Sequence, residues 1–206
     1  MKRDEVISVL KNKLNFSDQS VHKLILFHSE LLKANGRYNL ISSSTELTAW
    51  NRHILDSAQL VSYVDFEDNK TLCDLGTGAG FPGLVISIFN NNSKFHVKLY
   101  EKSPVKCDFL EKMIKLLNLD CKVIRTSYID EPKAVDYVVA RAFKKFTEVL
   151  RISREIGKDN HILIVLKGKN AQFEIDNALN YYKFSYTLKK SITEIDSKIV
   201  IVENIE

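Results

Sequence analysis

Asp-Leu-Gly-Thr-Gly-Ala-Gly-Phe-Pro-Gly, residues 74–83, is the most informative stretch of this 206-residue chain. An apolar run leads directly into Gly76, Gly78 and Gly80, which let the backbone turn sharply and approach a ligand closely. Pro82 stands where a helix would begin, and proline is tolerated there because a first-turn N–H has no partner within the helix. The order of strand, glycine turn and helix predicts a ligand site at the carboxyl end of an α/β sheet.

Short apolar runs alternate with stretches of helical spacing on the C-terminal side of residue 70. The runs expected to form strands are 71–75, 95–101, 122–126, 135–140 and 161–167. The expected helices between them are 82–90, 103–118, 145–156 and 170–180. Strands separated by helices predict βαβ units and a mostly parallel sheet. The last two β-rich runs, 183–189 and 198–203, have only a short connection, which can join only antiparallel neighbours.

The residues before this pattern have helical spacing. Ser17 is the expected N-cap of a second helix, and Gly36 is expected to end that helix. A third helical stretch is expected at 50–64. We therefore predict an N-terminal helical cap, residues 1–65, in front of an α/β domain, residues 66–206, with the two packed as one globular unit.

The composition limits the possible classes of protein. Hydrophobic residues make up 45% of the chain, enough for a core, and a formal net charge of +4 permits a polyanionic partner without requiring one. The three widely spaced cysteines argue against a disulfide framework, and the chain has neither CxxC nor a histidine ligand motif, so we expect no metal site. The densest apolar run, 84–89, is too short to cross a bilayer, and no secretory signal is visible. These features predict a cytoplasmic protein.

Two cofactors are compatible with the glycine turn. Residues 78–83 satisfy GxGxxG, the dinucleotide fingerprint, but this register leaves two extra residues after the strand. The register Asp74-x-Gly-x-Gly-x-Gly starts at the strand end and resembles the first motif of class I methyltransferases, which bind S-adenosylmethionine. Glu101, at the end of the second strand, can accept both ribose hydroxyls in either case. The antiparallel C-terminal strands favour a methyltransferase, because a common dinucleotide-binding domain has six parallel strands.

Further segments resemble one family, the bacterial small-subunit rRNA guanine-N7 methyltransferases, historically the glucose-inhibited division protein B family. The matching stretches, in the family's order, are Asn39-Leu-Ile, Arg52-His-Ile-Leu-Asp-Ser57, residues 74–83, Ser-Pro-Val-Lys-Cys-Asp-Phe-Leu (103–110), Ala140-Arg-Ala-Phe143 and Leu166-Lys-Gly168. They cover the chain from about residue 21 to its end. Glu101 and Ala140 stand where many members have aspartate and serine, and neither change removes a needed chemical group.

The resemblance implies a class I S-adenosylmethionine-dependent methyltransferase: a Rossmann-like, mostly parallel seven-stranded sheet with an antiparallel C-terminal strand, behind an N-terminal helical cap. It implies methylation of N7 of a guanine in the 530-loop of 16S rRNA (guanine 527 by rRNA convention), with 16S rRNA or the 30S subunit as partner. We expect a monomer. The family's cofactor contacts carry over to Gly76, Phe81, Tyr128, Ile129 and Arg141. The glycine turn and the ribose argument add Gly78, Gly80 and Glu101.

The chemistry of this reaction needs no deprotonation, because guanine N7 already presents a lone pair in the base edge. We therefore expect positioning residues, Arg141 and Lys167, in place of an acid/base pair. The chain lacks the [DNS]-P-P-[YFW] motif of amino-nitrogen methyltransferases, and no cysteine follows a proline as in cytosine-C5 enzymes. The candidate RNA-binding residues are Arg52, His53, Phe143, Lys144, Lys145, Lys167 and Lys169.

Each of these residues also has a structural interpretation. Phe143 is compatible with the core, the lysines with a solvated surface, and Arg141 with a surface salt bridge. His53 is compatible with a purely structural role, with Asp56 as a candidate buried partner for it or for Arg52. Three other functions stay open from the residues alone: a methyltransferase for another substrate, an NAD-binding oxidoreductase, and a binding module without catalysis. Whether naked rRNA or an assembled subunit is the substrate is also open.

Overall fold

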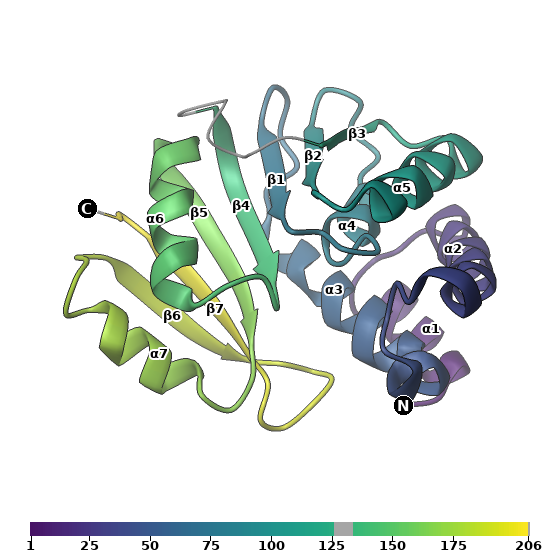
Figure 1. Ribbon diagram of the computed structural model, residues 1–206, viewed down its shortest axis with the longest axis horizontal. Helices are drawn as coiled ribbons and strands as arrows, with labels where there is room; N and C mark the ends of the chain where they lie inside the picture. Colours follow the sequence, from purple (N-terminus) through teal and green to yellow (C-terminus); the bar gives the residue numbers. More distant parts are fainter. Residues whose placement is uncertain (126–133, 206) are drawn as a thin grey trace.

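The computed structural model describes residues 1–125 and 134–205, and within them the chain forms one seven-stranded sheet (Figure 1). Its order is β3-β2-β1-β4-β5-β7-β6. The strands are β1 Thr71–Leu75, β2 His96–Tyr100, β3 Cys121–Ile124, β4 Val135–Arg141, β5 Gly157–Lys167, β6 Ser185–Lys190 and β7 Lys198–Glu203. Each overlaps a strand expected from the sequence, and only the end of the third run, Thr126, lies outside the described residues.

The sheet is parallel from β3 to β5, and β7 runs antiparallel to both of its neighbours. This arrangement confirms the predicted fold class and differs from the six parallel strands of a dinucleotide-binding domain. β1 pairs with β2 on one side and with β4 on the other, so the order of strands reverses there. Ligands of open α/β sheets bind at the carboxyl ends of the strands beside such a reversal. Leu75 pairs with Ala140, so β1 and β4 end side by side at this edge.

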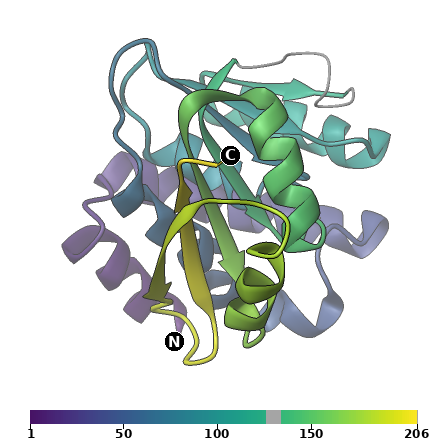
Figure 2. The ribbon, with the colours of Figure 1, turned by 90° about the vertical axis from the view of Figure 1, so that its left-hand side faces the viewer.

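Helices cover both faces of the sheet (Figure 1). They are α1 Arg3–Asn12, α2 Asp18–Tyr38, α3 Asp56–Ala58, α4 Gly83–Phe89, α5 Pro104–Leu117, α6 Phe146–Ile156 and α7 Ala171–Ala178. On β4, Tyr137 and Val139 pack into the core shared with the N-terminal helices, whereas Val138 and Ala140 pack into the core beneath α6 and α7. Because both faces are buried, the strand is apolar at every one of these positions. Figure 2 shows β6 and β7 at the near end of the sheet, beside α7.

Helix α2 begins as predicted and ends later than predicted. Ser17 caps it by accepting a hydrogen bond from the Ser20 N–H at 3.0 Å. The expected end at Gly36 is wrong, because the helix continues through this exposed glycine to Tyr38. Asn39 ends it with a φ of 47°, since asparagine tolerates the left-handed conformation that a helix end often needs.

The stretch expected to form a third helix is helical but changes its winding along its length. Trp50–Leu55 (η2) is a π-helix, α3 is a single α-helical turn, and Gln59–Tyr63 (η3) is a 3₁₀-helix. A short 3₁₀ segment, Ser43–Thr48 (η1), precedes it. A π-helical turn inserted in a helix is often found at functional sites. Here it carries Arg52 and His53 to the carboxyl edge of the sheet, as described below.

The proposed boundary between residues 65 and 66 stays a prediction. One apolar core contains Val6 and Leu24 from the N-terminal helices together with Leu72 and Val139 from the sheet. The cap therefore shares its core with one face of the α/β unit. In the part of the chain that the structure describes, no helix is both long and apolar enough to span a membrane.

Candidate active site

The three loop glycines have left-handed backbones, with φ values of 68° at Gly76, 60° at Gly78 and 105° at Gly80. Their surroundings differ. A Cβ on Gly76 would lie 2.3 Å from the Phe143 ring, and one on Gly80 would lie 2.8 Å from Leu84. A Cβ on Gly78 would meet only the Gly76 carbonyl oxygen, at 3.9 Å, so it would project into open space. Gly76 and Gly80 thus allow close packing, whereas Gly78 leaves room beside the loop.

Glu101 is fixed against this loop by three backbone N–H groups. Gly78 donates to Oε2 at 2.9 Å, and Lys102 and Ser103 each donate to Oε1 at 2.8 Å. A carboxylate offers about four acceptor positions, so one remains for a further donor. Beside it lies a cavity of about 240 Å³, here called the loop cavity. Its lining residues are Gly76, Tyr100, Glu101, Lys102, Ala142, Phe143 and Lys144.

Asp74 anchors the far end of the loop. Its side chain is fully buried, and its Oδ2 accepts the Gly83 N–H at 2.6 Å. Burial raises the pKa of Asp74 to about 6. A Cβ on Gly83 would lie 2.7 Å from that same Oδ2 and 2.4 Å from Leu99. Gly83 therefore allows the first turn of α4 to pack directly against the end of β1.

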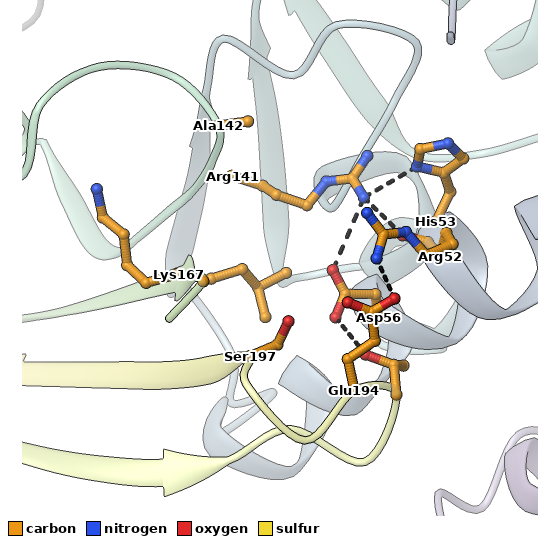
Figure 3. Close-up of a pocket in the computed structure, with 11 residues that line it drawn as sticks. Arg52, His53, Asp56, Arg141, Ala142, Lys167, Glu194 and Ser197 are labelled. Atoms are coloured by element: carbon orange, nitrogen blue, oxygen red, sulfur yellow. Dashed lines mark hydrogen bonds and ion pairs between the residues drawn. The ribbon is translucent and has the colours of Figure 1, made fainter. Parts of the chain in front are cut away.

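A second cavity, of about 470 Å³, lies between the N-terminal helices, the ends of β4 and β5, and the loop joining β6 to β7 (Figure 3). We call it the cap cavity. Its lining residues are Arg52, His53, Asp56, Arg141, Ala142, Leu166, Lys167, Gly168, Thr193, Glu194 and Ser197. Ala142 lines both cavities, and its φ of 49° is unusual for a residue with a side chain. The turn after β4 therefore separates two adjoining spaces at the carboxyl edge of the sheet.

Arg141 connects the sheet to the cap across this second cavity. Its Nη1 donates to the Arg52 carbonyl oxygen at 2.9 Å and to His53 Nδ1 at 3.0 Å. The same nitrogen lies 3.7 Å from Asp56 Oδ2. The guanidinium also lies over the Phe81 ring, 5.1 Å from its centroid. The candidate buried pairing of Asp56 with Arg52 or His53 is therefore wrong, because its ion pair is with Arg141, which is distant in sequence.

His53 is held as a neutral imidazole. Because Arg141 can only donate, Nδ1 must accept, so the proton is on Nε2 and is donated to Thr45 Oγ1 at 2.8 Å. Its ring stacks on Phe81 with centroids 5.2 Å apart. Burial, with Arg141 and Arg52 nearby, lowers the pKa of His53 to about 4. His53 therefore positions Arg141 by accepting its hydrogen bond, and it carries no charge at neutral pH.

A pH dependence of folding follows from this lowered pKa. In the unfolded chain the imidazole has its ordinary pKa of 6.5, so as pH falls it takes up a proton before the folded one does. The neutral His53 therefore stabilises the fold fully above about pH 6.5, and this stabilisation is lost as pH falls through about 4. Between pH 7 and pH 4 the unfolding free energy of the wild type should therefore fall by about 2 kcal/mol more than that of His53→Gln, after allowance for partial solvent screening. Urea unfolding at several pH values measures this. The exposed His96 provides the control, since His96→Gln should keep the wild-type slope; the same slope in His53→Gln would contradict the interpretation.

The predicted cofactor residues that the structure describes separate into three groups. Gly76 and Glu101 line the loop cavity, and Gly78 borders it through its bond to Glu101. The side chains of Phe81 and Arg141 lie on the cap side, where Phe81 packs against His53 and Phe27. Gly80 lies against Leu84, inside the packing of α4. Tyr128 and Ile129 lie outside the described residues.

The predicted RNA-binding residues are also divided. Arg52 forms an ion pair with Glu194, and Phe143 and Lys144 line the loop cavity. Lys167 borders the cap cavity, but its Nζ donates to Glu174 Oε2 at 2.8 Å and points away from Arg141 (Figure 3). Lys145 and Lys169 are exposed and form no ion pair with any residue that the structure describes.

The loop joining β6 to β7 contributes residues that the sequence did not indicate. This loop lines the cap cavity with Thr193, Glu194 and Ser197, which belong to none of the stretches that resemble the family. The only available signal was a polar stretch between two β-rich runs, which is also typical of an ordinary turn. Within the described ranges, no group of three or more His, Cys, Asp and Glu side chains is arranged to hold a metal ion.

This architecture, with its glycine loop and acidic strand end, is that of the S-adenosylmethionine-dependent methyltransferases. A solved methyltransferase of this class from Aquifex aeolicus superposes with a TM-score of 0.59 at 12% identity, covering 85% of this chain and 97% of that one. The family model for rRNA small subunit methyltransferase G matches residues 20–202. Ribosomal RNA small subunit methyltransferase G of Rickettsia akari is 37% identical over 93% of this chain and 98% of its own length. The corresponding Pelagibacter ubique protein is 34% identical over 96% of this chain and 94% of its own length. The chain belongs to the rRNA small subunit methyltransferase G family, as its motifs predicted.

Proposed function

We propose that this protein transfers a methyl group from S-adenosylmethionine to N7 of a guanine in the 530-loop of 16S rRNA. Membership of the family makes it a methyltransferase of small-subunit ribosomal RNA. The methyl donor, the atom and the nucleotide are the parts that we propose. We further propose that it acts as a monomer in the cytoplasm.

The pair of adjoining cavities carries this proposal. The loop cavity combines an open backbone approach at Gly78 with the anchored carboxylate of Glu101, whose remaining acceptor position suits a ribose hydroxyl of a nucleoside. The cap cavity offers arginine, histidine and carboxylate side chains, which suit the hydrogen-bonding edges of a base. Since Ala142 lines both, a donor in the first and an acceptor in the second would meet at this residue.

The mechanism that we propose depends on position. S-adenosylmethionine supplies an activated methyl group on a sulfonium, and guanine N7 supplies a lone pair that lies in the plane of the base. Holding two reactants in line and excluding water can contribute about 7–11 kcal/mol in well-oriented cases. The neutral His53 and the paired Arg141 fix the wall of the cap cavity, and neither has to gain or lose a proton. Glu101 would hold the donor through its ribose.

The RNA backbone is proposed to run over exposed lysines near this edge. Lys145 lies before α6 and Lys169 before α7, close to the ends of β4 and β5, respectively. Neutralising phosphates releases bound counterions, so affinity falls steeply as salt rises. Lys144, Lys167 and Arg52 are paired with carboxylates in the free protein, and they would have to exchange those partners to contact phosphate.

The test is incubation of the protein with labelled S-adenosylmethionine and either unmethylated 30S particles or naked 16S rRNA. We expect label at one guanine of the 530-loop, at N7, which chemical cleavage at that nucleotide detects. Label at another nucleotide or another atom would overturn the proposed specificity. Comparison of the two substrates identifies which one the enzyme uses.

A further inference from the structure

The cap cavity contains a carboxylate that the methyl transfer itself does not require. Asp56 is largely buried, with 16% of its side chain exposed. Thr193 Oγ1 donates to its Oδ1 at 2.9 Å, and Gln59 Nε2 donates to the same oxygen at 3.0 Å. These donors come from the loop between β6 and β7 and from η3, so elements far apart in sequence lock one orientation of the carboxylate.

The second oxygen of Asp56 keeps acceptor capacity. Oδ2 lies 3.7 Å from Arg141 Nη1, which is longer than a hydrogen bond, so this contact is an ion pair. Arg141 thereby balances the charge of the carboxylate, while its own donors go to the Arg52 carbonyl oxygen and to His53. A carboxylate held in this way accepts hydrogen bonds and cannot donate them while it is ionised.

We propose that Asp56 selects guanine by accepting hydrogen bonds from the N1–H and N2–H₂ groups of a base that enters the cap cavity. This inference rests on the proposed function, because it takes N7 of that base as the methyl acceptor. N7 must then face Ala142, the residue shared with the loop cavity. N1 and the 2-amino group are on the opposite side of a purine from N7. Ala142 and the Asp56 carboxylate lie well apart in the cavity, as this orientation needs (Figure 3).

The same carboxylate discriminates against adenine. Adenine presents a lone pair at N1 and no amino group at C2, so the Asp56 Oδ2 atom would face another acceptor and receive no hydrogen bond from the base. Desolvating a charged acceptor oxygen without giving it a donor is a strong selection against the wrong ligand. Glu194, the other carboxylate of the cavity, fits this role less well, because it is 40% exposed and is paired with Arg52.

The experiment combines one protein change with one base change. Two forms of the RNA substrate carry guanosine or inosine at the target position; inosine keeps N7, O6 and N1–H but lacks the 2-amino group. For the wild type, kcat/KM should be about tenfold or more lower with inosine, within the range expected for loss of a specific base contact. Asp56→Asn should be less active on guanosine and should discriminate between the two RNAs by less than about twofold.

A purely structural role for Asp56 gives a different result, because it would lower both rates equally and keep the wild-type ratio. That outcome would overturn the inference. Glu194→Gln is the matched control and should keep the wild-type ratio. If Asp56→Asn does not fold, Thr193→Val, which frees the carboxylate without removing it, should still reduce the ratio, and an unchanged ratio there counts equally against the inference. If the wild type binds S-adenosylmethionine but methylates neither RNA, the proposed function fails instead.

Discussion

Gly78→Val should abolish measurable S-adenosylmethionine binding while the protein stays folded. The backbone at Gly78 has a φ of 60°, and a Cβ there would meet only the Gly76 carbonyl oxygen, at 3.9 Å, so the added side chain starts in open space next to the loop. The left-handed strain costs about 1–2 kcal/mol of stability. Occupying the space needed by the cofactor should weaken binding by at least about 100-fold, or roughly 2.7 kcal/mol. Titration calorimetry measures the binding, and thermal unfolding measures the stability.

Gly36 gives the matched control for this change. It also has open space around the position of a Cβ, but it lies in the exposed interior of α2 and has an ordinary helical backbone. Gly36→Ala should therefore raise the unfolding free energy by about 0.5–1 kcal/mol and leave cofactor affinity unchanged. Normal binding by Gly78→Val would show that the cofactor does not lie beside this loop.

Arg141→Met should lower both stability and activity by large amounts. The change removes the two hydrogen bonds that link β4 to η2 and leaves Asp56 without its counter-charge. Removing one partner of a buried ion pair costs about 3 kcal/mol or more. Because the wall of the cap cavity would then lose its alignment, we expect kcat/KM to fall by about 100-fold or more. Urea unfolding and the methylation assay measure the two effects.

A double variant separates the loss of the pair from the loss of packing. Arg141→Met combined with Asp56→Asn no longer leaves a buried carboxylate unpaired, so it should regain part of the stability lost in Arg141→Met alone. Arg151 is the control arginine, since it forms an exposed ion pair with Glu155 on α6. Arg151→Met should cost less than about 1 kcal/mol. If Arg141→Met and Arg151→Met lost equal amounts of unfolding free energy, the buried contacts of Arg141 would stabilise the protein no more than an exposed ion pair does.

Much of the fold was predictable because its signals are local. Strand β1, the glycine turn and the start of α4 are adjacent in sequence, and their pattern follows from burial on both faces and from backbone geometry. The antiparallel β7 followed from the length of one connection. The error at Gly36 was also local: an exposed glycine was tolerated inside a long helix, and Asn39 supplied the left-handed end.

The hydrogen bonds and ion pairs of the site were not predictable, because they join residues that are distant in sequence. Asp56 meets Arg141 and Thr193 only after the sheet has formed, and no spacing along the chain signals either contact. Lys167 was identified at the sheet edge from its place in a strand, but its pairing with Glu174 depends on where α7 packs. Sequence reasoning therefore located the edge and several residues on it, whereas the assignment of partners required the folded structure.

The core shared by the cap and the sheet has a consequence for how the chain is made. Val6 near the start and Ile199 near the end belong to the same apolar cluster. At about 5–20 residues per second, synthesis of such a chain takes roughly 10–40 s. The cluster as a whole can therefore be completed only when β7 has been made, long after the first helices have left the ribosome.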